Sequence, residues 1–204
     1  MPKQFSPATV ARRPRLDAQR NREHILEVAR EAFAQHGPET TLDYIARRAE
    51  IGPGTLYRHF PTRDALIEAV FRSQVEKLTA AGQRYAAAMR PLDALRAWMV
   101  VFIEYVAGKT LILPAMDTVS GGSNRMIEGS RGPIHGTFRG LVQSAIDSGE
   151  LRADTDPDDI IRVLIGVFHT TSLPGWESSA RRIVDILIDG SRTRDPSREI
   201  APRK

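Results

Sequence analysis

The 204-residue sequence predicts an all-α fold in two parts, a small N-terminal group of helices followed by a larger helical region. Apolar residues recur at the three- and four-residue spacings of helices, and no segment shows the strict alternation of a half-buried strand. Proline and glycine at 37–38, 52–54 and 91 divide the chain into helix-sized segments. We expect a flexible basic arm at 1–17, a head at 18–66, a larger domain at 67–190 and a polar tail at 191–204.

The first expected helix runs from Arg20 to Gly37, because Ile25, Ala29 and Phe33 lie on one apolar stripe at helical spacing. The pair Gly37-Pro38 ends it. The next helix is short and begins at Thr40 or Thr41, either of which can accept backbone N–H bonds as its cap.

Residues 50–60 predict a tight turn and a second short helix. Gly52 frees the backbone for the turn, and Pro53 or Gly54 opens the helix without losing a needed N–H. Leu56 and Phe60 are four apart and face the core, which leaves a polar outer face. Two helices joined by a glycine-containing turn, the second short and polar outside, are typical of a helix-turn-helix.

Thr62 caps a longer helix that continues to about Met89. After Pro91, apolar residues repeat at +3 and +4 from Leu92 to Val106, and Gly108 should stop that helix. Residues 120–132 are rich in glycine and serine, so we expect a mobile loop or a helix broken in the middle, followed by a helix at 134–148.

The last two expected helices, which begin near Asp154 and at Trp176, are apolar on almost every face. Such helices must be buried on all sides, against a second subunit or within a monomeric core. We expect a homodimer. Its candidate interface residues are Ile161, Leu164, Phe168, Ile183, Ile186 and Leu187.

The head resembles the DNA-binding segment of TetR-family transcriptional regulators. The resemblance rests on the first helix, RNREHILEVAREAFAQHG, and on the run GTLYRHFPTRDAL, and it covers roughly residues 18–70. It implies a three-helix helix-turn-helix domain, a helical effector-binding and dimerisation domain, and a repressor released from a near-palindromic operator by a small-molecule ligand. An alternative is a DNA-binding protein of the same fold without an effector, with an architectural role or control by a protein partner.

Charge and side-chain chemistry select the candidate DNA contacts. Residues 1–90 hold 15 basic and 10 acidic residues, whereas 91–204 hold 14 and 15, so the positive balance lies with the head. Arg58 is the residue able to grip guanine bidentately, and Arg63 stands where the family usually has lysine for phosphate. Arg47 could equally pair with Asp43. The complete candidate set is Thr41, Arg47, Gly52, Pro53, Thr55, Tyr57, Arg58, His59 and Arg63.

Aromatic and methionine side chains with a few polar groups, between residues 91 and 175, could line a small-molecule cavity. Ordinary core packing is the alternative for each of them. The candidate pocket residues are Trp98, Met99, Phe102, Tyr105, Met116, Phe138 and His169. The sequence does not identify the ligand.

Enzyme chemistry is not expected. Cysteine is absent, the five histidines lack metal-ligand spacing, and no nucleophile-elbow, zinc-protease or P-loop motif occurs. We therefore predict no catalytic residue, metal site or cofactor. No apolar run approaches 18 residues, so we expect no membrane association and a cytoplasmic, nucleoid-associated protein.

Overall fold

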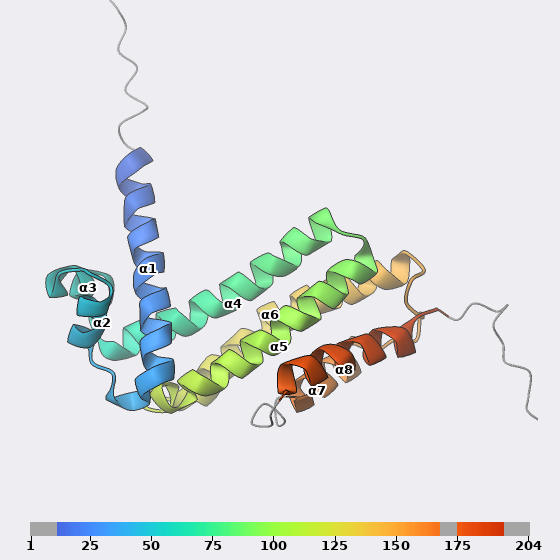
Figure 1. The fold of residues 1–204 in the computed structure, drawn as a ribbon. Coiled ribbons are helices and arrows are strands. Elements are labelled where there is room, and N and C mark those ends of the chain that lie inside the picture. Colours follow the sequence, from blue (N-terminus) through green and yellow to red (C-terminus); the bar gives the residue numbers. More distant parts are fainter. Residues whose placement is uncertain (1–11, 168–174, 194–204) are drawn as a thin grey trace, which may run out of the picture. The chain divides into compact units, whose positions relative to one another are not determined.

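The computed structural model describes residues 12–167 and 175–193, without the side chains of residues 12–16. In these parts of the chain the regular elements are helices joined by turns, with one isolated bridge between Leu151 and Arg192. The all-α prediction is confirmed (Figure 1). The elements in order are α1 (Arg12–His36), the 3₁₀ helix η1 (Gly37–Glu39), α2 (Leu42–Arg48), α3 (Pro53–His59), α4 (Arg63–Ala88), α5 (Pro91–Met116), α6 (Gly122–Asp147), α7 (Pro157–Val167) and α8 (Trp176–Ser191).

The chain forms two compact units that do not coincide with simple N- and C-terminal halves. One groups the chain up to Ser73 with Leu111–Asn124, and the other groups Gln74–Thr110 with the chain from Arg125 onward. Helices α4, α5 and α6 therefore each contribute residues to both units.

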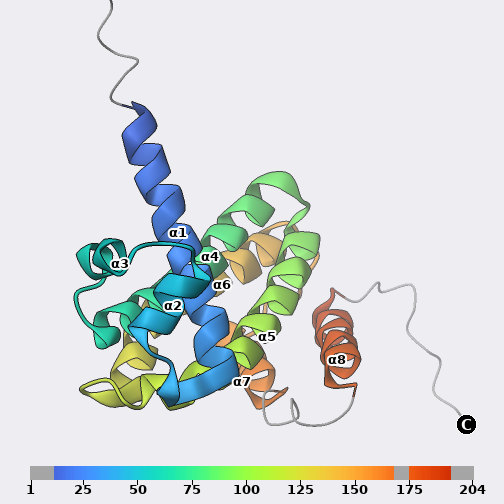
Figure 2. The same cartoon turned by 60° about the vertical axis from the view of Figure 1, so that its left-hand side comes forward.

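The first unit has its core where α1, α2, α3 and the start of α4 meet. Helix α2 packs against both α1 and α3 (Figure 2). Small residues of α2 and the following turn, Ala46 and Ala49, are buried and allow this close packing. The largest fully buried side chains of this unit are Ile25, Phe33, Ile45, Leu56, Leu66, Ile67 and Met116.

The second unit is centred on Trp98 of α5. Its indole stacks on Phe102 and Phe138 with ring centroids 5.3 and 5.4 Å apart, and its Nε1–H donates to the Leu78 carbonyl at 3.1 Å. Gly82 of α4 approaches this cluster so closely that an added Cβ would lie 2.3 Å from the Thr137 methyl group. Aromatic side chains therefore fill this core, and the buried Trp98 Nε1–H has a hydrogen-bond partner.

Two predicted interruptions are wrong. Helix α5 continues through Gly108 and Pro114 to Met116, and α6 begins at Gly122 and stays continuous through the segment 120–132 and past Pro133. A glycine costs a helix roughly 1 kcal/mol, whereas burying an aliphatic side chain such as Ile112 returns roughly 1.5–3 kcal/mol. Tertiary burial therefore outweighs the local signal.

The N-terminal arm also differs from expectation. Helix α1 begins at Arg12, so residues 12–17 extend the first helix instead of belonging to a flexible arm. The remaining part of the expected arm, 1–11, and the tail beyond 193 lie outside the described residues.

Helix α5 is long and apolar enough to meet the length and hydropathy criteria for a membrane span. Its buried face includes Leu95, Trp98 and Met99, which are fully enclosed by the protein. A core helix satisfies the same criteria, and we interpret α5 as one.

Candidate nucleic-acid interface

The first helix of the motif, α2, is capped by Thr41. The Thr41 hydroxyl oxygen accepts from the Tyr44 amide at 3.2 Å. Thr40 has a different role, because its side chain is buried and its hydroxyl donates to the Ala32 carbonyl at 3.1 Å. The alternative between the two threonines is thus resolved, and Thr41 stays exposed at the helix N-terminus, where partial positive charge favours a phosphate.

The turn after α2 depends on Glu50 and not on Gly52. The Ile51 amide donates to the Ala46 carbonyl at 3.0 Å and the Glu50 amide to the Arg47 carbonyl at 3.2 Å, which is the Schellman pattern of a helix C-terminus. Glu50 takes the left-handed position of that motif, with φ of 55°. The sequence prediction placed the special conformation at Gly52, which is extended, with φ of −66°.

Gly52 lies instead at the start of the second helix of the motif. It is exposed at the N-cap of α3, and a Cβ added to it would meet no atom within 4 Å. Neither backbone strain nor packing within the protein requires glycine here. A bare backbone at this exposed position leaves room for another molecule to approach closely.

Helix α3 has one buried and one outward face. Leu56 and Phe60 anchor it at 0 % and 2 % exposure, and the Arg22 guanidinium lies 5.4 Å from the Phe60 ring centroid. Tyr57 is 45 % exposed and Arg58 is also exposed. A seven-residue helix is not stable by itself, so its anchors hold it in place while the outward side chains stay free. Thr55 and His59 are half-buried beside them.

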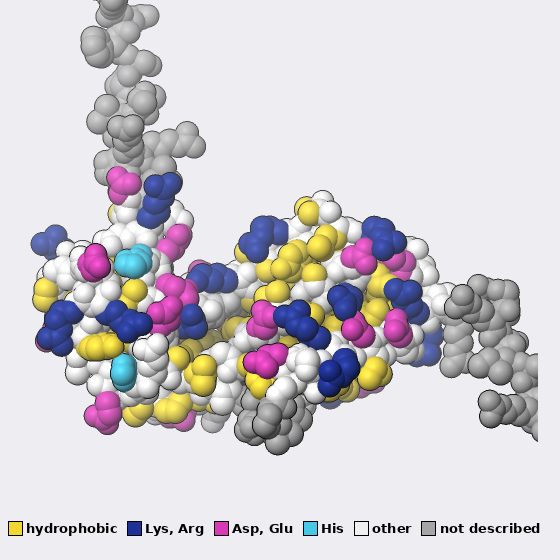
Figure 3. All heavy atoms as spheres, viewed as in Figure 1, with side chains coloured by type: hydrophobic (Ala, Val, Ile, Leu, Met, Phe, Trp, Pro, Cys, Tyr) yellow, Lys and Arg dark blue, Asp and Glu magenta, His cyan; other side chains and the backbone are white. Residues whose placement is uncertain are grey.

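The arginines of the motif divide into free and engaged side chains. Arg47 and Arg58 are exposed and make no ion pair with any described residue, so the open possibility of an Arg47–Asp43 pair is not realised. Arg48 interacts with the Tyr44 hydroxyl and with Glu31, both at 3.4 Å, and its pKa is raised, first by the Tyr44 hydrogen bond and then by Glu31. Figure 3 shows basic side chains interspersed with histidine and acidic side chains on the surface of the region that contains α1 to α3.

Arg63 does not project freely from the start of α4. Its Nε donates to the Thr40 carbonyl at 3.1 Å, one terminal nitrogen donates to the Pro38 carbonyl at 2.9 Å, and the other donates to the Thr118 hydroxyl at 2.7 Å. The guanidinium carbon lies 5.3 Å from the centroid of the Phe33 ring. Sequence reasoning missed these contacts, because their partners are 23 to 55 residues away along the chain.

Five of the six expected pocket residues that the structure describes lie in the core. Trp98, Met99, Phe102 and Phe138 are buried in the second unit, Met116 is buried in the first, and His169 lies outside the described residues. Tyr105 is half-buried, and burial raises its pKa to about 12 despite an opposing hydrogen bond with Ser130.

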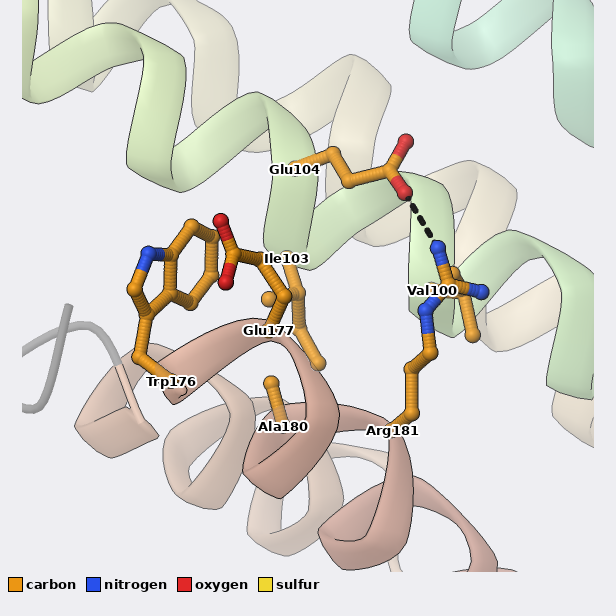
Figure 4. Close-up of a pocket in the computed structure, with 7 residues that line it drawn as sticks. All are labelled: Val100, Ile103, Glu104, Trp176, Glu177, Ala180 and Arg181. Carbon is orange, nitrogen blue, oxygen red and sulfur yellow. Dashed lines mark hydrogen bonds and ion pairs between the residues drawn. The ribbon is translucent and has the colours of Figure 1, made fainter. Parts of the chain in front are cut away.

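A small cavity of about 20 Å³ lies between α5 and α8. Figure 4 shows Trp176 and Ala180 of α8 beside Ile103 of α5, with the Glu104–Arg181 ion pair of 2.9 Å at the edge. The volume is comparable to that of one or two water molecules. None of the seven lining residues was among the candidate pocket residues.

The candidate dimer residues differ in exposure. Ile161 and Leu164 are buried within the protomer, Ile183 and Leu187 are half-buried, and Ile186 is 69 % exposed. Phe168 lies outside the described residues. Two further apolar side chains of α7, Val163 and Ile165, are exposed at 45 % and 44 %. The sequence could not separate the inner from the outer apolar residues of α7, because both sets are equally hydrophobic.

Comparison with known proteins assigns the family. Residues 25–70 match the model of bacterial regulatory proteins of the tetR family, and residues 90–193 match the C-terminal domain of SbtR-like transcriptional regulators. The solved structure of a TetR transcriptional regulator from Streptomyces coelicolor is 38 % identical, with a TM-score of 0.77, and the match covers 85 % of this chain and 99 % of that one. The chain belongs to the TetR family of transcriptional regulators.

Two curated relatives extend the comparison. The transcriptional regulator SrpR of Pseudomonas putida is 26 % identical over 94 % of this chain and 84 % of its own length. The probable acrEF/envCD operon repressor of Escherichia coli is 30 % identical, and the match covers 48 % of this chain and 46 % of that protein. Members of the TetR family are non-enzymatic transcription factors that bind DNA operators and usually act as dimers with small-molecule effectors. The chain is accordingly a DNA-binding regulator and not an enzyme.

Proposed function

We propose that this TetR-family regulator is a homodimeric repressor that binds a near-palindromic operator and is released by a small molecule. The observation that carries the proposal is the outward face of α3, where Tyr57 and Arg58 are exposed while Leu56 and Phe60 fix the helix from below. A short helix held this way can enter a major groove without rearranging its own core.

The contacts divide by chemistry. Arg58 would read guanine through its guanidinium fork, and Thr55 would contact a neighbouring base edge. Thr41 and Arg47 would bind phosphate, Tyr57 and His59 would bind phosphate or a thymine methyl group, and Gly52 with Pro53 would permit close approach. Such a protein would act in the cytoplasm, in association with the nucleoid. The exposure of Thr41, Arg47, Tyr57 and Arg58 supports these roles, because an exposed side chain can contact DNA without leaving the core.

Dimerisation is supported by the exposed apolar residues of α7 and α8. Val163, Ile165 and Ile186 face outward although apolar residues of this size are usually enclosed. A two-fold dimer would place two α3 helices about one turn of DNA apart, roughly 34–36 Å, which gives a near-palindromic operator.

Release by an effector is supported by polar groups placed within an apolar region. Lys109 of α5 is half-buried, makes no ion pair with a described residue, and has a pKa lowered by burial. Tyr105 lies one helical turn before it and also carries a shifted pKa. A few polar groups among apolar side chains are typical of ligand sites.

The filled cluster of Trp98, Phe102 and Phe138 favours the second candidate, a regulator without a small-molecule effector. A ligand much larger than a water molecule would have to displace side chains to bind in the small cavity between α5 and α8.

One experiment tests both candidates. The full chain is used to enrich duplexes from a random DNA library, and the enriched duplex is footprinted with and without a small-molecule extract of the source cells. We expect protection of two half-sites about one turn apart, lost on adding extract. Failure to enrich any duplex would refute the DNA-binding proposal, and protection that persists with extract would favour the regulator without effector.

A further inference from the structure

The Arg63 side chain forms hydrogen bonds within the protein, whereas a phosphate-binding cation would keep its donors free for DNA. All three of its nitrogens donate to protein oxygens, namely the carbonyls of Pro38 and Thr40 and the hydroxyl of Thr118. The Phe33 ring lies against the guanidinium plane. To reach a phosphate, the side chain would have to give up hydrogen bonds made by a charged donor, which are among the stronger ones in proteins.

We propose that Arg63 is an internal positioning residue that fixes the start of α2, and with it the helix-turn-helix, to the turn between α5 and α6. This inference concerns how the proposed DNA-binding face is held, so it rests on the proposed function. It assigns to Arg63 no contact with DNA.

We call the Arg63 guanidinium and the oxygens that it binds the Arg63 clamp. One side of this clamp holds the residue before the start of α2. The Thr40 carbonyl accepts from Arg63, and the Thr40 hydroxyl donates to the Ala32 carbonyl of α1. The next residue is Thr41, whose hydroxyl caps α2. Fixing Thr40 therefore fixes the backbone amides and hydroxyl that would meet phosphate at the α2 N-terminus.

The other side of the clamp is the turn after α5. The Thr118 hydroxyl accepts from Arg63 at 2.7 Å and donates to the Ala115 carbonyl at the same distance, which holds its oxygen in one orientation. This turn joins α5 to α6, and both helices continue from the first unit into the second. A shift of this turn would consequently move the Arg63 guanidinium, which also binds the Thr40 carbonyl.

Lysine cannot replace arginine in this arrangement. Arginine has a rigid planar fork that serves several acceptors at once, whereas lysine offers one point charge on a flexible chain. For a phosphate contact the two cations are nearly equivalent. The exchange Arg63→Lys therefore separates a clamp from a phosphate contact while leaving the net charge unchanged.

The test measures binding of the full-length Arg63→Lys, Arg63→Gln and Thr118→Val variants to the duplex enriched by the wild-type chain and to an unrelated duplex. We expect Arg63→Lys to weaken binding to the enriched duplex about 10- to 100-fold, since it disrupts hydrogen bonds of a charged group. The slope of log K against log salt should stay at the wild-type value for all three variants. Thr118→Val removes no charge and should still weaken binding, by about 3- to 10-fold.

The phosphate-contact model gives the opposite pattern. Arg63→Lys and Thr118→Val would bind normally, and Arg63→Gln would flatten the salt slope by about 1.8 for a dimer on both duplexes. Additivity of Arg63→Lys and Thr118→Val in the double variant would likewise overturn the clamp, because residues that act through one hydrogen bond are coupled.

Hydrogen–deuterium exchange of the protein alone measures whether the clamp stabilises the segments that it joins, without DNA present. Both Arg63→Lys and Thr118→Val should speed exchange in segments 37–48 and 115–122, and unchanged exchange in the first segment would refute the proposal. If the wild-type chain enriches no duplex, the proposed function fails while this measurement still decides the clamp. If Arg63→Lys does not fold, as judged by circular dichroism, Thr118→Val decides alone in both assays.

Discussion

Helices α3 and α5 use their large side chains in opposite ways. The seven-residue α3 buries Leu56 and leaves Tyr57 and Arg58 outside, so its anchoring and its candidate binding groups lie on different faces. The 26-residue α5 encloses Trp98, Met99 and Phe102, and the same side chains that hold the second unit together were the candidates for a pocket.

This difference determines what mutations can show. In α3, a substitution on the outer face can change DNA binding without changing stability. In α5, a substitution at Trp98, Met99 or Phe102 would change stability together with any ligand binding at these side chains, since a tightly packed core leaves little free volume. A small molecule that bound within this core would have to rearrange it, whereas DNA bound to the outer face of α3 would leave the anchors of α3 in place.

The largest expected effect is that of Trp98→Ala. It removes a fully buried indole that stacks on two aromatic rings and donates to the Leu78 carbonyl, and should lower the free energy of unfolding by about 3–5 kcal/mol. Urea denaturation at constant m-value measures it. Trp98→Phe keeps most of the ring packing and should cost less. An unfolding free energy unchanged by Trp98→Ala would mean that this core is not filled as described.

Tyr105 should make the second unit sensitive to alkali. Burial raises its pKa to about 12, from the ordinary tyrosine value of 10.0. Below pH about 10 the phenol is neutral in both folded and unfolded chains, and between about 10 and 12 the unfolded state alone loses the proton. Stability should therefore fall as the pH rises through this window, by about 2–3 kcal/mol.

The measurement is urea denaturation of the wild type and of Tyr105→Phe from pH 9 to about 12. Phenylalanine has no proton to lose, so the variant should lose less stability over this range. Parallel curves for the two proteins would show that Tyr105 titrates normally in the folded state.

Arg58→Ala should affect recognition and leave stability intact. The side chain is exposed and unpaired among the described residues, so the free energy of unfolding should change by less than about 0.5 kcal/mol. If it grips guanine, specificity should relax at one base pair per half-site at a cost of about 1–3 kcal/mol. Binding to a library of operator variants measures this.

Arg47→Ala is the matched control, since Arg47 is also exposed and unpaired among the described residues. As a phosphate contact it should weaken binding to all sequences alike and reduce the salt slope by about 0.9 per half-site. If both alanine variants showed the same profile across the library, the assignment of Arg58 to base reading would be refuted.

The sequence predicted the head better than the second region, for a physical reason. Caps, proline positions and the spacing of Leu56 and Phe60 act within a few residues, and such local signals survive folding unchanged. Helix α5 continues through Gly108, because residues beyond it are buried. This burial depends on contacts with distant segments, which a local sequence pattern does not reveal. The hydrogen bonds of Arg63 and the exposure of Ile186 depend on tertiary structure in the same way.

Gly52→Ala isolates close approach to DNA from folding. A methyl group at this position meets no protein atom within 4 Å, and the extended backbone suits alanine, so the unfolding free energy should be unchanged or slightly higher. DNA affinity should nevertheless fall about tenfold, or about 1.4 kcal/mol, if the backbone lies against the duplex. Normal affinity would show that the glycine is not needed at the interface.

The smallest expected effect is that of Glu50→Gly. Glu50 holds the left-handed C-terminal position of α2, with φ of 55°, which costs a residue with a Cβ about 1–2 kcal/mol. Glycine removes this cost but loses more entropy on folding, so a net gain of about 0.5–1 kcal/mol in unfolding free energy is expected. Glu50→Gln removes the charge and keeps the strain, so it should not stabilise. If glutamine stabilised the protein as much as glycine, charge repulsion and not backbone conformation would limit the stability of this turn.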